Sequence, residues 1–177
     1  MKTMVIFAAL VAAVAVPALA QTIPSPQTSA SEGEKATATL FVQDSVGDVQ
    51  LGMLGLQKAR NASVRALAHA MVRDHTRTAQ AGMQVAQQIG DDEAQFKAGD
   101  DNQIHLSHLA RYAGATFDRE FIAAMIDAHK NDIATARDAL EFAVTPALRT
   151  YLRDAIAVDT RHLHMAEAAQ TQVGKPG

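Results

Sequence analysis

Three histidines occupy inward positions on three separate predicted helices, each in line with the apolar stripe of its helix: His75, His129 and His162. Neutral imidazole is a good ligand for zinc, copper or iron. A single inward histidine is more often a core side chain that is satisfied by one hydrogen bond. A metal site therefore depends on whether the three side chains meet.

Counting residues from the predicted turns places these histidines in one layer. Asp48 and His75 lie 13 and 14 residues on either side of a turn near Asn61, and the other two histidines lie 16 and 17 residues on either side of a turn near Thr145. At about 1.5 Å of rise per residue, the members of each pair lie level with each other. A helical bundle can hold a metal through side chains on facing helices. The predicted metal ligands are His75, His129, His162 and Asp48.

Further side chains near this layer could extend the site. Carboxylates beside an imidazole can hold its tautomer or add a ligand, and the candidates are Asp74, Asp159 and Asp132. Met125 and Met165 lie one turn from the layer, where a thioether would favour copper(I), although methionine is also a common core residue. The metal itself, whether zinc, copper or iron, stays open.

Composition excludes several other chemistries. The chain has no cysteine, which removes disulfides, thiolate metal sites and a cysteine nucleophile. It has no Glu-x-x-His motif, which disfavours a carboxylate-bridged di-iron centre. With 16 Lys and Arg against 19 Asp and Glu, its net charge of -3 argues against nucleic acid as a partner. His105 and His108 form a second pair at i, i+3, for which a solvated helix face is the favoured interpretation.

The elements that must position these residues are all predicted to be helices. Proline is absent between Pro26 and Pro146, and apolar residues recur at helical rather than alternating spacing. We predict an all-α fold, an antiparallel four-helix bundle of ferritin-like type, with a short extra helix in the connection between the second and third long helices. The expected helices cover residues 36–60, 61–89, 102–113, 116–144 and 146–170.

The N-terminal residues are predicted to be an export signal rather than part of the fold. Lys2, the apolar run from Met4 to Val16 and the Ala18-Leu19-Ala20 sequence have the pattern of a cleaved signal peptide, with an uncleaved anchor as the alternative. We therefore expect a signal peptide at residues 1–20, a flexible linker at 21–35 and the bundle domain at 36–172. The expected location is the periplasm, with outer-membrane association left open and no stable membrane span after processing.

Several short runs resemble a known family: Asp48-Val-Gln-Leu-Gly-x-Leu, Asp74-His75, Phe117-Asp118 and His162-Leu-x-Met-Ala. They are similar to the exported bacterial family called domain of unknown function 4142, whose members resemble ferritin-like four-helix bundles. The resemblance covers about residues 41 to 169. It implies that the family's acid on the first helix falls on Asp48, where Glu is usual, and that its later histidines fall on His75, His129 and His162.

Three functions remain open on this basis. The first is a binding module that stores or buffers a transition metal or protects against stress. The second is a ferritin-like redox enzyme at the same site, which is less favoured. The third is a structural or envelope-stress protein that holds no metal. A metal ion is the one partner that the sequence indicates, and no protein partner is suggested.

Overall fold

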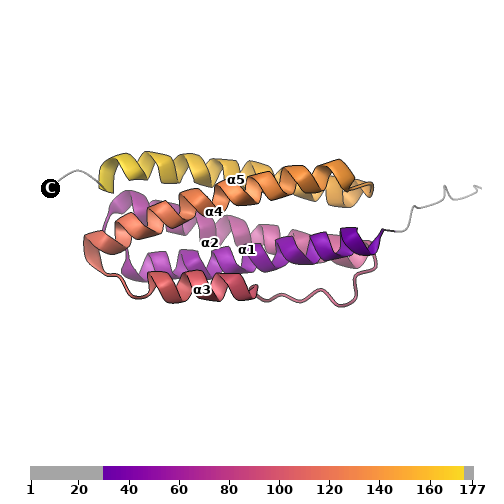
Figure 1. The fold of residues 1–177 in the computed structure, drawn as a ribbon, viewed down its shortest axis with the longest axis horizontal. Helices are drawn as coiled ribbons and strands as arrows, with labels where there is room; N and C mark the ends of the chain where they lie inside the picture. Colours follow the sequence, from indigo (N-terminus) through magenta and orange to yellow (C-terminus); the bar gives the residue numbers. More distant parts are fainter. Residues whose placement is uncertain (1–29, 174–177) are drawn as a thin grey trace, which may run out of the picture.

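The structure is a computed structural model, and it describes residues 30–173. This part of the chain forms five helices and no strand, so the predicted all-α bundle is confirmed. The helices are α1 (Glu32–Lys58), α2 (Ala62–Gln88), α3 (Asp100–Leu109), α4 (Gly114–Phe142) and α5 (Pro146–Val173). Figure 1 shows two antiparallel hairpins, α1–α2 and α4–α5, stacked along their length, with the short α3 lying along the outside of α1.

Helix α1 begins four residues earlier than the sequence analysis placed it. Ser31 and Glu34 form a capping box, in which the Ser31 hydroxyl accepts from the Glu34 amide at 3.2 Å and the Glu34 carboxylate accepts from the Ser31 amide at 3.1 Å. Residues 32–35, which were assigned to the linker, are therefore helical. The predicted signal peptide and most of the predicted linker lie outside the described residues.

Each hairpin supplies a buried carboxylate to the turn of the other hairpin. Glu34 at the start of α1 accepts from the amides of Val144 and Thr145, in the α4–α5 turn, at 2.9 and 2.8 Å. Asp118 near the start of α4 accepts from the amides of Arg60 and Asn61, in the α1–α2 turn, at 3.1 and 2.9 Å. These bonds satisfy backbone N–H groups that helix ends leave without an intrahelical partner.

The two hairpins also match each other residue for residue at their turns. Arg65 donates to the carbonyls of residues 56 and 59, and Arg149 donates to those of residues 140 and 143. Arg149 follows Arg65 by 84 residues in the sequence, and Asp118 follows Glu34 by the same number. The bundle is thus built from two hairpins of equal architecture.

Met53 on α1 lies at the surface, although helical spacing of the apolar residues in the expected helix 36–60 predicts an inward position for it. In the structure 59% of its surface is exposed. The reason is that α1 turns Gly52 and Gly55 toward α2: a Cβ on Gly52 would lie 2.9 Å from a methyl group of Val72, and one on Gly55 would lie 2.8 Å from Ala68 Cβ. This close approach of the two helices rotates Met53 to the surface.

The start of α4 also differs from the expected boundaries, which ended the short helix at residue 113 and began the next long helix at residue 116. Instead Gly114 is the first residue of α4, with a φ of +59° that side chains rarely tolerate, and Ala113 is the N-cap. The short helix α3 was predicted correctly in kind and begins two residues earlier than expected. Among the described residues, no helix has the length and apolar character that a membrane span needs.

Candidate metal centre

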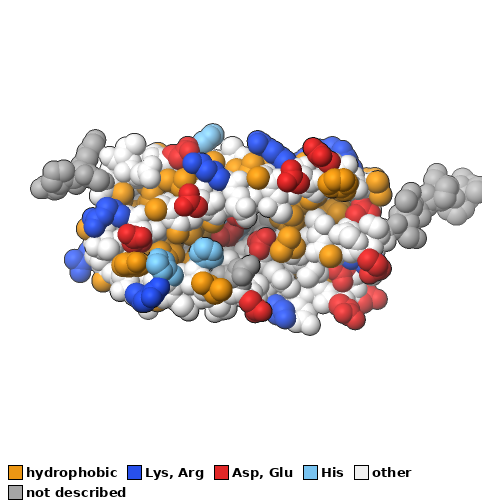
Figure 2. Space-filling view, viewed as in Figure 1, with side chains coloured by type: hydrophobic (Ala, Val, Ile, Leu, Met, Phe, Trp, Pro, Cys, Tyr) orange, Lys and Arg blue, Asp and Glu red, His pale blue; other side chains and the backbone are white. Residues whose placement is uncertain are grey.

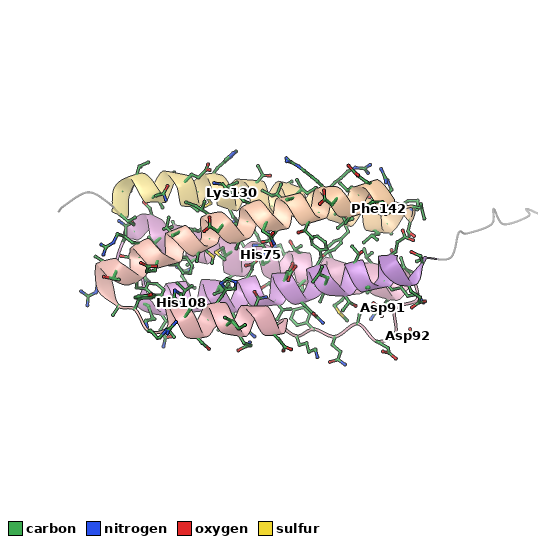
Figure 3. All side chains as sticks on the ribbon, viewed as in Figure 1. His75, Asp91, Asp92, His108, Lys130 and Phe142 are labelled. Atoms are coloured by element: carbon green, nitrogen blue, oxygen red, sulfur yellow. The ribbon has the colours of Figure 1, made fainter. Side chains whose placement is uncertain are left out.

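The three predicted histidines meet in the core of the bundle. His75 comes from α2, His129 from α4 and His162 from α5, and none exposes more than 2% of its surface. The ring centroids lie 4.9 to 5.6 Å apart. One nitrogen from each ring lies within 4.8 Å of the nitrogens of the other two. The side-chain view in Figure 3 shows His75 in the interior between the hairpins. We call this set the inner position.

This polar layer separates two apolar clusters that fill the ends of the bundle. One cluster includes Leu51, Met71, Phe121 and Ala166, and the other includes Phe41, Ala86, Leu148 and Leu152. The inner position therefore lies away from both helix turns, as the residue counting predicted. Rigid packing on both sides holds the imidazoles in place.

A charged network fixes the orientation of His162. Its Nε2 lies 3.1 Å from the Asp74 carboxylate, which is also bound by the guanidinium groups of Arg73 at 2.8 Å and Arg161 at 3.2 Å. The Arg73 hydrogen bond holds the pKa of Asp74 below its usual range, although partial burial acts in the opposite direction. An ionised carboxylate can only accept, so His162 Nε2 donates to it. The Nδ1 lone pair of His162 then faces His75 Nε2 at 3.1 Å.

Burial holds two of the imidazoles, those of His75 and His162, in the neutral form that a metal requires. Burial lowers the pKa of His75 well below its ordinary value, and the neighbouring histidines add to this effect. Burial also lowers the pKa of His162 to about 4, against the raising effect of Asp74. Neutral imidazole is the metal-binding form, so neither of these two ligands has to lose a proton near neutral pH.

His129 is fully buried, yet neither of its ring nitrogens has a hydrogen-bond partner, and Nδ1 of His75 also lacks one. Leaving a buried polar group without a partner costs about 1–3 kcal/mol. Buried polar groups in proteins are nearly always satisfied. A metal ion that accepts the lone pair of each ring, which one nitrogen of a neutral imidazole carries, would account for part of the exception.

Two buried carboxylates lie beside His75, as the sequence analysis anticipated. Asp48 Oδ2 is 3.5 Å from His75 Nε2, and Asp159 Oδ1 is 3.9 Å from the same atom. Burial raises the pKa of Asp48 well above its ordinary value, and it raises that of Asp159 to about 8, with repulsion from Asp132 adding to both shifts. In the metal-free protein both groups favour the protonated form.

The remaining predicted residues fall into three groups. Asp132 Oδ2 lies 3.6 Å from His129 Nδ1, so this acid reaches the layer. Met125 is buried, and Met165 is half-buried against the apolar cluster at the α1–α2 turn. His105 and His108 are exposed on α3, where Arg111 lies 2.6 Å from His108 Nδ1. Among the described residues, two sets of three side chains bring their ligand atoms within 4.8 Å of one another: the histidine trio, and Asp48, His129 and Asp132. No residue of α3 belongs to either set.

The buried acid Asp159 gives the metal-free protein a measurable pH dependence. Its pKa is raised in the folded state, so its contribution to stability is complete below about 3.8, its ordinary value, and is lost as pH rises to about 8. His75 and His162 act in the opposite direction, because their pKa is lowered in the folded state and their contribution to stability rises as pH increases through about 6.5, their ordinary value.

We therefore expect the free energy of unfolding to fall by about 2 kcal/mol through Asp159 between pH 6.5 and 8, at about 1.4 kcal/mol per pH unit. Urea unfolding at the two pH values measures it. Asp159→Asn should remove this part of the decline, whereas the exposed Asp154→Asn on the same helix should retain it. An unchanged decline in Asp159→Asn would contradict the assignment.

Comparison with known proteins agrees with the fold. A family model described as Domain of unknown function (DUF4142) matches residues 19–169, and the chain belongs to this family. No curated protein matches the chain. Two solved structures share its fold, both with a TM-score of 0.67. One is CopM in the Ag-bound form, which is 20% identical, and the match covers 80% of this chain and 98% of that chain. The other is CopM in the Cu(II)-bound form, which is 19% identical, and the match covers 78% of this chain and 96% of that chain.

Proposed function

For this member of the DUF4142 family, we propose a binding function: the bundle holds one transition-metal ion at His75, His129 and His162, with Asp48 beside them. The role is storage, buffering or protection against metal stress rather than catalysis. The observation that carries the proposal is His129, a fully buried imidazole whose two nitrogens have no hydrogen-bond partner. Three imidazoles from three helices match the nitrogen ligands that zinc and copper prefer.

Copper is the first metal to test. The two structures that share this fold contain CopM with silver and with copper(II), which supports a metal of this class without fixing it for this chain. Imidazole nitrogen suits copper(II) and zinc, and the buried thioether of Met125 beside the layer would suit copper(I). Iron is the less suited candidate, because the trio offers nitrogen ligands only.

The proposed setting is outside the cytoplasm. The pattern in residues 1–20 has the form of a signal peptide, and its cleavage would release the bundle into the periplasm. A metal-buffering protein there would meet incoming ions before they cross the inner membrane. Intact-mass measurement of exported protein, with a first residue at Gln21, tests this part separately.

The binding test uses metal-free protein titrated with Zn²⁺ by calorimetry and with Cu²⁺ by electron paramagnetic resonance. We expect about one equivalent of tightly bound metal, with nitrogen hyperfine structure from imidazole in the copper spectrum. The double variant His75→Gln/His162→Gln should lose the tightly bound equivalent, because two of the three nitrogen ligands are gone.

The chain offers a matched control on the same two helices. His69 on α2 and His164 on α5 are exposed, so His69→Gln/His164→Gln removes the same number of imidazoles without touching the core. Its binding should equal that of the unmodified protein. If the core variant keeps the metal and a His105→Gln/His108→Gln variant loses it, the ion binds on α3 and the proposal is wrong.

A further inference from the structure

A cavity of about 260 Å³ lies next to the inner position, between α1, α3 and α4. Its walls carry an unusual share of polar groups for the interior of a small bundle: Asp44, Asp48, Asn102, His105, Asn131 and Asp132. Asp48 is buried and Asp132 is half-buried, so the acids lie at different depths of this cavity. Figure 2 shows the face that carries α3, with acidic side chains around a recess near its centre and histidine side chains close by.

The packing of the helices explains why the cavity is on this side. Helices within each hairpin contact each other along their length, and α2 also packs against α5, whereas α1 and α4 make few contacts. The short helix α3 covers this open side: Asn102 lies against Gly47 of α1 so closely that a Cβ on that glycine would overlap its amide group. The amide of Asn102 also donates to the carbonyl of Gln43 at 3.4 Å.

His129 connects the cavity to the inner position. Its Nδ1 lies 3.6 Å from Asp132 Oδ2, and one ligand atom each from Asp48, His129 and Asp132 lie within 4.8 Å of one another. Asp48 in turn lies 3.5 Å from His75. The two groups therefore share His129 and touch through Asp48, so an ion could move between them over a short distance.

We propose that Asp48, His129 and Asp132 form a second cation position, the outer position, through which a divalent metal ion reaches the inner position. Two carboxylates and one imidazole suit divalent ions that accept mixed oxygen and nitrogen ligands, such as Mn²⁺ and Zn²⁺. The second half of this proposal, delivery of the ion to the inner position, rests on the proposed function. The first half, binding of a cation at the outer position, does not depend on it.

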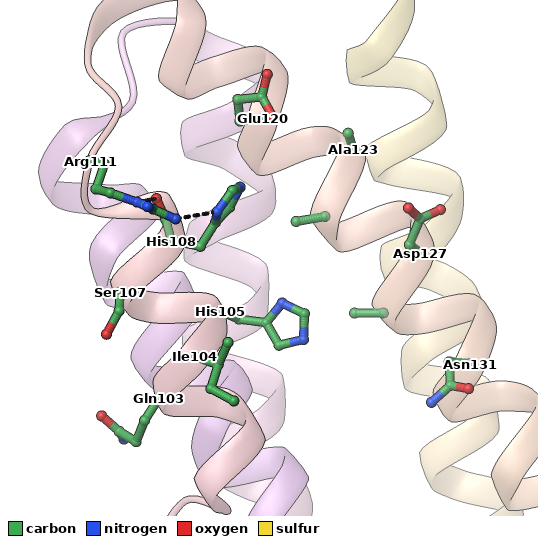
Figure 4. A pocket seen from close by; sticks show the side chains of 12 residues that line it. Gln103, Ile104, His105, Ser107, His108, Arg111, Glu120, Ala123, Asp127 and Asn131 are labelled. Carbon is green, nitrogen blue, oxygen red and sulfur yellow. Dashed lines mark hydrogen bonds between the residues drawn. The ribbon is translucent and has the colours of Figure 1, made fainter.

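A surface groove leads to this position. It has a volume of about 1080 Å³, lies between α3 and α4, and shares His105, Ala128 and Asn131 with the cavity. The close view in Figure 4 shows the His105 side chain directed from α3 toward α4, where Asp127 and Asn131 lie. His108 in the same groove is bound by Arg111, which leaves His105 as the imidazole next to the cavity. An ion would thus pass from water to His105 and then to the acids.

The outer position is tested with Mn²⁺ alone, because this ion prefers oxygen ligands and loses its sharp resonance when it is bound. The unmodified protein should bind about one equivalent, and so should His75→Gln/His162→Gln, which keeps the outer ligands. Asp132→Asn should weaken Mn²⁺ binding at least tenfold. This variant preserves shape at a half-buried residue, and circular dichroism checks that it folds. Asp138→Asn, an exposed change on the same helix, should bind as the unmodified protein does.

A second measurement tests the route to the inner position. Transfer of Zn²⁺ from a chromophoric indicator, followed by stopped flow, should be at least tenfold slower in Asp132→Asn than in Asp138→Asn. Mn²⁺ binding that is absent, or that survives Asp132→Asn, would overturn the outer position. Zn²⁺ loading at the normal rate in Asp132→Asn would overturn its role in access. Mn²⁺ binding that depends on Asp132, in a protein that binds no Zn²⁺ at the histidines, would uphold the outer position and refute the proposed function.

Discussion

Adding Zn²⁺ or Cu²⁺ to the metal-free protein raises its unfolding temperature, and His129→Ala abolishes the rise. A ligand that binds only the folded state stabilises it by about 2.7 kcal/mol at a free concentration of one hundred times the dissociation constant. For a domain of this size, that corresponds to roughly 5–10 °C. His129 belongs to both groups of candidate ligands, so its loss removes the metal response whichever group holds the ion.

The pH dependence of this response distinguishes the buried histidines from surface ones. Ordinary histidines take up protons near pH 6.5 and would release metal below about pH 6. Burial lowers the pKa of His162 to about 4 and that of His75 well below its ordinary value, so the rise in unfolding temperature should persist at pH 5.5. Differential scanning fluorimetry at pH 5.5 and 7.5 measures it, with His164→Ala as the control. A response that is lost at pH 5.5, or retained in His129→Ala, would place the ion elsewhere.

Asp118→Ala lowers the free energy of unfolding by about 3 kcal/mol or more. The buried carboxylate accepts two backbone N–H groups in the α1–α2 turn, at 3.1 and 2.9 Å. Hydrogen bonds to charged groups contribute roughly 1.5–3 kcal/mol each, and their removal leaves two donors without a partner. Glu34→Ala should have an effect of the same order, because Glu34 makes the equivalent bonds to the α4–α5 turn.

Denaturant unfolding with matched variants isolates this contribution. Asp118→Asn keeps the shape and one carbonyl oxygen, so it should lose less than Asp118→Ala. Asp138→Ala, an exposed position on the same helix, should change the free energy of unfolding by less than about 0.5 kcal/mol. A loss of under 1 kcal/mol in Asp118→Ala would show that water can replace the carboxylate at this turn.

Residue counting along the helices predicted the histidine layer correctly, because helical rise is uniform and the hairpin turns are short. His75, His129 and His162 therefore fall at one level even though the predicted helix ends are shifted by up to four residues. The same regularity explains why the fold class could be predicted: apolar spacing and punctuation by Asn61 and Pro146 define the hairpins.

What sequence reasoning missed depends on contacts between distant segments. Arg161 reaches Asp74 on another helix, and Glu34 reaches the α4–α5 turn, 110 residues away at the nearest. The start of α1 had a local signal, the Ser31-x-x-Glu34 capping box, that could have moved the boundary. The rotation of Met53 to the surface had none, because it follows from how closely α2 approaches Gly52 and Gly55.

The exchange of buried carboxylates between the two turns makes the hairpins depend on each other. If either hairpin formed first, water would bond the two turn amides that a carboxylate of the other hairpin accepts from in the bundle. A partial structure that contains one hairpin therefore lacks the stabilisation that these carboxylates provide at both ends of the bundle. Such reciprocity favours an all-or-none transition and keeps the histidine layer from opening by separation of the two hairpins unless the whole bundle unfolds.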